Sequence, residues 1–540
     1  ATRRAKSNTF NPMYYNPNAT YTAPKVFSTL GVEQQLSTSF TKAPHNGYNS
    51  ARGDANLSND YKVHWTYDPN AAAPTTYGFS NTSIRLAENP TSDFRSVTVS
   101  RNTNGTTTTA PTPGGIIFAI TRTESTSCTA TASYPGIFTN IAANCSSTSN
   151  NNYIATLQQR GVSAYYYIYD ASKKTNCSTG DDDCYTLRFV TASEQQNFAN
   201  WYSFYRNRAL ATISAAALAF YDLSSEVRLS WQSLKDCTSF TSTNASSTCR
   251  NNAFKAYSTA HKGQLYSWLQ SVNFAGGTPL PDAMIRAGNF YMTDRPWEKN
   301  PGATGNTTAN TYACRPSYHI MMTDGIWGTA ASSTPSNFRH DNTNIDLPDN
   351  VKYTGQRPYQ DSQPNTLADL AMHYWATDLR SSIPNELKPY TPFKSGNNTT
   401  DYWDPRNDPA TWQHMTNFMM GLGLTESLDN PKIPWGGSTH KGAGYQALLG
   451  GEPWPKASAS GGNNNVYDLW HAALNSRGEF FSVDSPEAMV QAFREILNRI
   501  ADRSATAARP AVSASFVSDN INQLQSRVYA TQFSSEDWSG

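Results

Sequence analysis

The sequence has few charged residues and almost no net charge. Asp, Glu, Lys and Arg make up 15% of its 540 residues, and 42 basic residues oppose 41 acidic ones, so the formal net charge is +1. This balance gives no general attraction to nucleic acid or to an anionic membrane. We therefore expect no nucleic-acid partner.

Long apolar runs and familiar catalytic motifs are missing as well. No stretch approaches the ~20 apolar residues that a helix needs to span a bilayer, and residues 1–6 hold no apolar signal-peptide core. There is no Gly-x-Ser-x-Gly elbow, no His-Glu-x-x-His and no phosphate-binding glycine loop with a lysine. We expect no membrane span and favour a protein that is not an enzyme, although carboxylates paired only by folding leave no trace in a sequence.

What the sequence has instead is polar uncharged and aromatic residues. Aromatic residues reach 12%, with 30 Tyr, 23 Phe and 13 Trp, and hydrophobic residues reach 38%. This is enough for a packed core and excludes global disorder. The length favours three or four domains of ~150 residues each. An Asn-, Thr- and Tyr-rich chain of this kind is typical of a secreted protein.

The seven cysteines also favour export. Six of them form close pairs along the chain: Cys128 with Cys145, Cys177 with Cys184, and Cys237 with Cys249. Polar residues separate the two members of each pair, which suits short loop-closing disulfides, although six cysteines permit other connectivities. Cys314 is left over. It is either a thiol buried beside a core strand or bonded to a partner outside this chain.

The chain divides into two regions that differ in composition and in the spacing of their apolar residues. Residues 11–193 carry short alternating runs between turn residues, with strands predicted at 114–120, 164–169 and 185–190 and an exposed loop at 101–113. Beyond residue 194, helices and apolar strands alternate. Helices are predicted at 198–222, 261–272, 281–291, 366–380 and 485–502, and strands at 227–234, 318–323, 415–424 and 480–483. This order predicts an α/β fold with a doubly wound, mostly parallel sheet.

Two loops of this predicted sheet carry oxygen ligands. Asp324 follows the apolar strand 318–323, and Thr278 lies in a Gly-Gly-Thr loop that opens a helix. Ligands of doubly wound folds bind at the carboxyl ends of the strands, where both loops would lie. A hydroxyl and a carboxylate suit Mg²⁺ or Ca²⁺. The alternatives are a turn role for Asp324 and a helix N-cap role for Thr278.

Both loops resemble the metal-ion-dependent adhesion site of the von Willebrand factor A fold. That family carries Asp-x-Ser-x-Ser after its first strand, a Thr in its second loop and an Asp after its fourth strand. Gly276-Gly277-Thr278-Pro279-Leu280 matches the second part, and Met322-Thr323-Asp324-Gly325 matches the third. The resemblance implies that Thr278 coordinates the metal directly and Asp324 through water, with an acidic group of a partner completing the shell. Such a site adheres and does not catalyse.

The first part of that motif does not occur in the sequence. Asp170-Ala171-Ser172-Lys173-Lys174 and Asp222-Leu223-Ser224-Ser225-Glu226 both depart from Asp-x-Ser-x-Ser at the last position. The predicted domain also begins at its first helix, without a convincing first strand. Either that strand and its ligands precede Ala1 in a longer precursor, or the metal site is degenerate. We favour the first.

A narrower resemblance covers nearly the whole chain. Segments 11–21, 365–375, 412–424 and 532–540 resemble blocks of the PilY/PilC family, the large type IV pilus tip adhesins, in the family's order. The most specific blocks are Asn365-Thr366-Leu367-Ala368-Asp369 and Trp412-Gln413-His414-Met415. In that family a long insertion separates the metal motif of the first strand from the first helix.

The resemblance implies three parts. Residues 1–197 would be a β-rich, disulfide-containing insertion between the missing first strand and the first helix. Residues 198–503 would be a von Willebrand A-like domain with loop insertions at about 293–316 and 328–364. Residues 504–540 would be a linker toward a C-terminal domain, and the family's C-terminal β-propeller is not present in this chain.

The family also implies a function. It predicts an extracellular, non-enzymatic adhesin at the tip of a type IV pilus, exported through the periplasm. Its expected partners are a host-cell or abiotic surface ligand and the minor pilins, on which it would dock to help pilus assembly. The expected cofactor is a divalent metal, Mg²⁺ or Ca²⁺. Two alternatives stay open: a structural tip protein with a degenerate metal site, and a secreted metal-dependent hydrolase acting on surface glycans.

Three short motifs carry less weight. Arg52-Gly53-Asp54 is an integrin-type tripeptide in a polar turn. Asp181-Asp182-Asp183 lies within the Cys177–Cys184 loop and favours a solvated acidic loop over a calcium site. Residues 341–346 space oxygens at alternate positions, but they lack the glycine and closing glutamate of an EF-hand.

Overall fold

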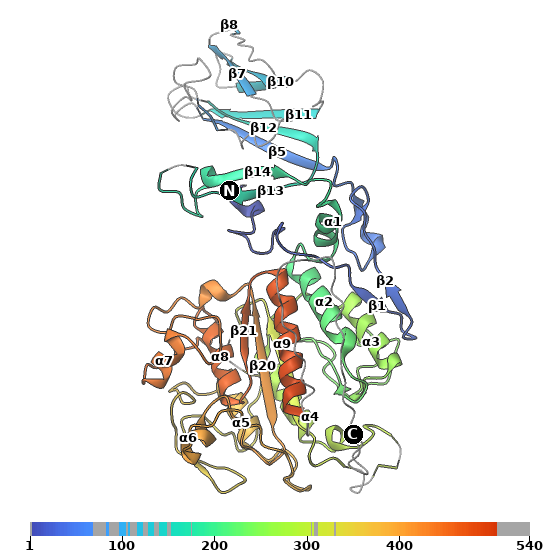
Figure 1. Cartoon of the computed structure of the whole chain (residues 1–540), viewed down its shortest axis with the longest axis vertical. Helices are drawn as coiled ribbons and strands as arrows, with labels where there is room; N and C mark the ends of the chain where they lie inside the picture. Colours follow the sequence, from blue (N-terminus) through green and yellow to red (C-terminus); the bar gives the residue numbers. More distant parts are fainter. Residues whose placement is uncertain are drawn as a thin grey trace.

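The computed structural model describes twelve ranges of the chain: residues 3–68, 83–85, 97–103, 106–107, 116–122, 128–133, 140–147, 153–173, 175–303, 305–306, 311–328 and 331–504. Between residues 62 and 162, and at residue 183, it describes the backbone alone. Figure 1 shows an elongated molecule, with a group of β-strands at one end and a helix-covered parallel sheet at the other.

The first part of the chain is rich in short strands, which pair antiparallel except for one parallel pair, β7 with β9. Their bounds are β1 (Lys25–Phe27), β2 (Glu33–Gln35), β3 (Ala43–Pro44), β4 (Asp54–Ala55), β5 (Tyr61–Asp68), β6 (Ser83–Arg85), β7 (Val97–Thr103), β8 (Thr106–Thr107), β9 (Ile116–Arg122), β10 (Cys128–Ser133), β11 (Asn140–Ser147), β12 (Tyr153–Val162), β13 (Tyr165–Tyr169) and β14 (Tyr185–Phe189). Two four-stranded sheets form, in the orders β11-β12-β5-β6 and β10-β9-β7-β8. The strands predicted near β9, β13 and β14 are confirmed.

The predicted loop at 101–113 is wrong over its first residues, because β7 and β8 extend to Thr107. Threonine is a good strand former, so its abundance there favours a strand as readily as a loop. Residues 108–113 lie outside the described part of the chain.

Two of the three predicted disulfides are present, Cys177–Cys184 and Cys237–Cys249. The third, Cys128–Cys145, lies outside the described side chains. Cys314 is a free and exposed cysteine, so the prediction of a buried thiol is wrong. It lies in the loop before the core strand, where the chain still runs over the surface.

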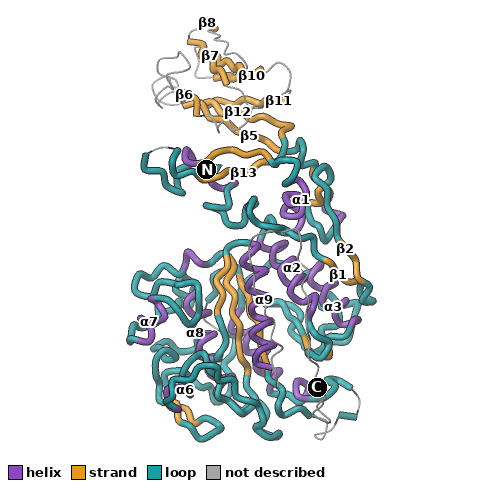
Figure 2. The backbone as a smooth tube through the Cα atoms, viewed as in Figure 1, coloured by secondary structure: helices purple, strands orange, loops and turns teal. Residues whose placement is uncertain are grey.

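The second part alternates helices with strands (Figure 2). Its helices are α1 (Gln195–Phe204), α2 (Arg208–Ala219), α3 (Thr259–Ser271), α4 (Leu280–Tyr291), α5 (Leu367–Ala376), α6 (Asn398–Trp403), α7 (Ala443–Leu449), α8 (Asn465–Asn475) and α9 (Pro486–Ser504). Its strands are β15 (Arg228–Leu229), β16 (Lys255–Ala256), β17 (Ser317–Thr323), β18 (Ile345–Asp346), β19 (Lys352–Tyr353), β20 (Met415–Leu422) and β21 (Phe480–Val483). No described helix is both long and apolar enough to cross a bilayer.

The core is a parallel sheet in the order β17-β20-β21. Alternate side chains of each strand face opposite layers of helices. Met321, Met419 and Phe480 pack against α4, α5 and α8. Phe418 and Met420 pack against α2, α3 and α9. Every residue of β20 is buried, as expected of a parallel strand covered on both faces, and the α/β prediction is confirmed at this level.

The strand β17 lies at an open edge of this sheet. No strand within the described ranges pairs with its outer side. Tyr318, His319 and Ile320 are accordingly only partly buried, although helices cover both faces of the sheet. The prediction of a single strand at 227–234 is corrected to β15, which pairs with β16 in a separate two-stranded sheet.

The predicted helix 198–222 is two helices. α1 ends at Phe204, and α2 begins at Arg208 with Asn207 as its N-cap, whose side-chain oxygen accepts a hydrogen bond from the amide of Leu210 (2.9 Å). The break turns α2 onto the sheet while α1 stays with the β-rich part (Figure 1).

A segment at residues 11–22, here called the strap, joins the two parts. Trp201 of α1 donates from Nε1 to the carbonyl of Met13 (3.1 Å), and Asn197 accepts from the amide of Tyr21 (2.7 Å). The Tyr21 hydroxyl in turn donates to Glu487 of α9 (2.6 Å). The strap therefore contacts both the first and the last helix of the described chain.

Candidate functional site

Thr278 lies in the loop before α4, at the carboxyl edge of the parallel sheet. Gly276 takes a φ of +109°, which favours glycine and turns the loop toward the helix. The N-cap of α4 is Pro279, so the alternative role of Thr278 as N-cap is wrong. Pro281 and Asp282 occupy the first turn as predicted, where a proline and an acidic residue both suit a helix start.

Asp324 follows the last residue of β17. The Thr323 hydroxyl oxygen accepts a hydrogen bond from the amide of Gly325 (3.2 Å), which turns the chain directly after the strand. The Asp324 side chain is 62% exposed. A Cβ built on Gly325 would lie 3.4 Å from Oγ1 of Thr278, so the structure brings the two predicted loops together. We call this edge, with Thr278 and Asp324, the rim.

Arg208 also belongs to the rim, and sequence reasoning missed it. Its Nη1 donates to the Asp324 carbonyl (3.3 Å) and lies 4.0 Å from Oδ2 of the Asp324 carboxylate. Its guanidinium lies over Gly423, just beyond β20, where a Cβ would collide with it. The missed signal is Asn207, a strong N-cap residue inside a stretch that otherwise reads as continuous helix.

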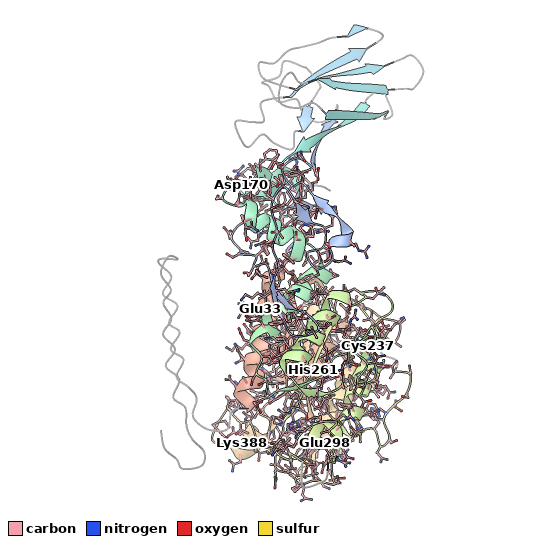
Figure 3. All side chains as sticks on the ribbon, turned by 90° about the vertical axis from the view of Figure 1, so that its right-hand side faces the viewer. Glu33, Asp170, Cys237, His261, Glu298 and Lys388 are labelled. Atoms are coloured by element: carbon pink, nitrogen blue, oxygen red, sulfur yellow. A yellow bond between two sulfur atoms is a disulfide. The ribbon has the colours of Figure 1, made fainter. Side chains whose placement is uncertain are left out.

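Lys235 adds a second cation nearby. Its exposed side chain lies along Gly276 and Gly277, the two residues before Thr278. Figure 3 shows the flank of the molecule that carries this region, with Cys237 labelled two residues beyond Lys235. Arg208 therefore lies beside the Asp324 loop, and Lys235 lies beside the Thr278 loop.

As ligands for a divalent metal, Thr278 and Asp324 fit in chemistry, because both are hard oxygen donors on one edge. They supply two ligands, whereas Ca²⁺ takes six to eight and Mg²⁺ about six. No cluster of three or more His, Cys, Asp or Glu side chains suited to a metal occurs among the described residues. Further oxygen ligands would have to join these two.

The three short motifs fall elsewhere. Arg52, Gly53 and Asp54 are all exposed, at the end of a short 3₁₀ turn where Gly53 takes a φ of +77°. Asp182 accepts a hydrogen bond from the amide of Arg4 (3.2 Å), so the acidic loop holds the start of the chain.

The segment 341–346 contributes one residue, Asp341, to a buried polar cluster between α5 and α8. Asp341 and Asp369 have no exposed surface, and the Asp341 amide donates to Asp369 (2.9 Å). Burial raises the pKa of both carboxyls, and the neighbouring charge of Asp369 raises that of Asp341 further. Each is tied to the protein's own groups, so the cluster stabilises the packing of the loop onto α5.

Asp468 of α8 completes this cluster. Its two carboxylate oxygens accept from the amides of Leu367 (2.8 Å) and Ala368 (3.0 Å), at the start of α5. Burial raises the pKa of Asp468 to about 7, although these two hydrogen bonds oppose the shift. A carboxyl with such a pKa changes charge near neutral pH.

Two histidines, one in and one beside the core strands, are hydrogen-bonded within the fold. His319 bonds through Nδ1 to Oδ1 of Asn417 (2.8 Å), and His414 bonds through Nε2 to Asp408 (2.9 Å). Burial pushes the pKa of Asp408 up, but the charge and hydrogen bond of His414 outweigh it and lower the pKa overall. Neither histidine faces the rim loops.

Three known proteins resemble this chain over much of its length. The type IV pilus biogenesis factor PilY1 of Pseudomonas aeruginosa strain PAO1 is 38% identical over 546 residues, covering 99% of this chain and 39% of that protein. PilY1 of strain PAK gives the same identity and coverage. PilY1 of strain UCBPP-PA14 is 46% identical over 384 residues, covering 70% of this chain and 32% of that protein. No family model and no solved structure matches the chain.

The parallel sheet and its polar rim define an α/β protein whose exposed edge, rather than its core, offers the place for a ligand. The sequence relationship is more specific. The chain belongs to the PilY1 family, and it spans 39% of the length of the first two relatives.

Proposed function

We propose that this chain is part of a type IV pilus biogenesis factor that also acts as a non-enzymatic adhesin at the pilus tip. The observation that carries the proposal is the 38% identity to PilY1 over 99% of the chain. Its location would be extracellular, on the bacterial surface, after passage through the periplasm. Minor pilins would be its assembly partners, and a host-cell or abiotic surface would carry its ligand.

The von Willebrand A-like assignment belongs to this proposal. A parallel sheet with helices on both faces supports it, as does the meeting of Thr278 with the Asp324 loop at one edge. The open side of β17 supports it further, because a strand carrying Asp-x-Ser-x-Ser would pair there. That strand would end at the same rim and bring more oxygen ligands.

Thr278 and Asp324 would then hold a divalent metal, Mg²⁺ or Ca²⁺, together with those added ligands. When bound, the metal supplies a positive centre that an acidic group of the ligand can reach. The chain's own contribution is to fix a hydroxyl and a carboxylate on one exposed edge, at the ends of rigid elements. In this proposal the metal and its ligands bind an acidic group of the partner. They do not attack the partner chemically, so the proposed site is adhesive and not catalytic.

A second candidate is a structural tip protein with a degenerate metal site. Arg208 favours it, because a permanent cation already lies against Asp324. The two candidates differ in whether surface binding depends on divalent cations. Both keep the role in pilus assembly.

The test uses the full-length protein in its native cells, with Thr278→Ala and Asp324→Ala introduced together. We expect normal numbers of surface pili, counted by electron microscopy, because the rim lies apart from the core. Adhesion in the presence of Ca²⁺ and Mg²⁺ should fall at least fivefold, to the level that EDTA gives with the unaltered protein. A matched control replaces the exposed Asp346 with Asn.

Each outcome separates the candidates. Adhesion that is unchanged by the double substitution and by EDTA would favour the structural tip protein. Loss of pili in the double variant would place the rim in assembly instead. If deletion of the whole gene left both pili and adhesion intact, the proposed function would be wrong.

A further inference from the structure

Arg208 is a basic residue at the N-terminal end of α2, where the helix dipole favours acidic residues. It is the first residue of α2, where the helix dipole presents about half a positive charge. A cation there is unfavourable for the helix, and acidic residues are the usual choice. The position therefore needs an explanation other than helix stability.

The surroundings of Arg208 supply that explanation. Its guanidinium donates to the carbonyl of Asp324 and lies near the carboxylate of the same residue, at 4.0 Å. Gly423 leaves the space that the guanidinium fills, since any side chain there would collide with it. Three elements, α2, β17 and β20, thus converge to hold one cation against one carboxylate.

Positively charged groups lie beside both loops of the rim. The start of α2 and Arg208 bring positive charge close to Asp324, and Lys235 brings it close to the Thr278 loop. Asp324 is 62% exposed and Arg208 is 45% exposed, so both remain in contact with solvent ions. A divalent cation that approaches Asp324 meets repulsion from the guanidinium.

We propose that Arg208 is the built-in counter-charge of Asp324, and that a divalent cation binds the rim only by displacing it. This rests on the proposed metal-binding role of Thr278 and Asp324. Arg208 is a positioning residue that sets the cation affinity of the rim. Arg208 thereby lowers the affinity of the rim for divalent cations, so that binding requires the cation concentrations of the extracellular medium.

The experiment titrates CaCl₂ and MgCl₂ into the purified full-length protein by isothermal titration calorimetry. It compares the unaltered chain with Arg208→Gln, Arg208→Lys and Arg208→Glu. Removing one charge at about 6 Å from a divalent ion should tighten binding about tenfold. Arg208→Lys should stay near the unaltered affinity, and Arg208→Glu should bind more tightly than Arg208→Gln.

The controls separate charge from folding. Arg494→Gln removes an exposed arginine from the middle of α9, beyond the rim loops, and should not change the affinity. Arg208→Glu keeps the fold, because an acidic residue suits the first turn of a helix. Asp324→Asn combined with Arg208→Gln should abolish the gained binding. Thermal unfolding without cation confirms that each variant is folded.

Two results would overturn the proposal. If the unaltered chain and Arg208→Gln bound Ca²⁺ equally and Asp324→Asn removed both, the metal site would stand and the role of Arg208 would be wrong. A second result would be that no variant bound either cation, even at millimolar cation concentrations in at least 10-fold excess over the protein. The metal site and the role of Arg208 would then both be wrong, whereas the role in pilus assembly would be unaffected.

Discussion

At the scale of single residues, Asp468 should make the stability of the protein depend on pH. Its pKa is about 7 in the folded chain, above its ordinary value of 3.8, so the folded state holds the proton more tightly than the unfolded state. The free energy of unfolding therefore falls as pH rises between about 4 and 7. The slope from one such group is about 1.4 kcal/mol per pH unit.

Asp468→Asn should flatten this slope between pH 5 and 7, because asparagine stays neutral and resembles the protonated acid. Urea unfolding at several pH values, followed by far-UV circular dichroism, measures the change. Asp346→Asn, at an exposed carboxylate, is the matched control and should keep the slope. A slope unchanged by Asp468→Asn would show that another group of the cluster takes up the proton.

The residues of the candidate site were predictable only in part. Asp324 follows an unbroken apolar strand and Thr278 precedes a clear helix start, so local patterns place both at strand or helix ends. Arg208 was hidden because the sequence predicts one continuous helix over residues 198–222, which places Arg208 inside it and not at a helix start. Its role depends on the contact with Asp324, which lies 116 residues further along the chain.

At the scale of elements, the start of α2 decides where Arg208 lies. Asn207→Ala removes the side-chain oxygen that accepts the amide of Leu210 and should lower the free energy of unfolding by about 1 kcal/mol. Asn207→Asp keeps an acceptor and should cost much less. Thermal and urea unfolding of both variants test the difference, and equal stabilities would refute the capping role.

The helix α8 was not predicted from the sequence. Every residue of α8 is buried, and its polar residues Asn465, Asp468 and His471 make this short segment resemble a polar loop in the sequence. By contrast α9 carries a clear apolar stripe, and its predicted start at Ser485 agrees with the hydrogen bond from the Ala488 amide to the Ser485 hydroxyl (3.1 Å).

At the scale of the whole molecule, cysteine chemistry gives a direct test. In the folded chain without reductant, a maleimide should label Cys314, because it is free and exposed. Peptide mapping should recover Cys177–Cys184 and Cys237–Cys249, together with the Cys128–Cys145 pair that the sequence predicts. Labelling of Cys177 or Cys237 would contradict the disulfides and weaken the argument for export.

The strap has a consequence for the order of folding. Tyr21 bonds to Glu487, a residue 466 positions later, and Val490 of α9 packs beside the aromatic cluster around the strap. A contact this distant in sequence cannot form while the chain is still being synthesised up to α9, and closing so long a loop is slow. The strap can bond to α1 early, but it bonds to α9 only once nearly the whole described chain is available to fold.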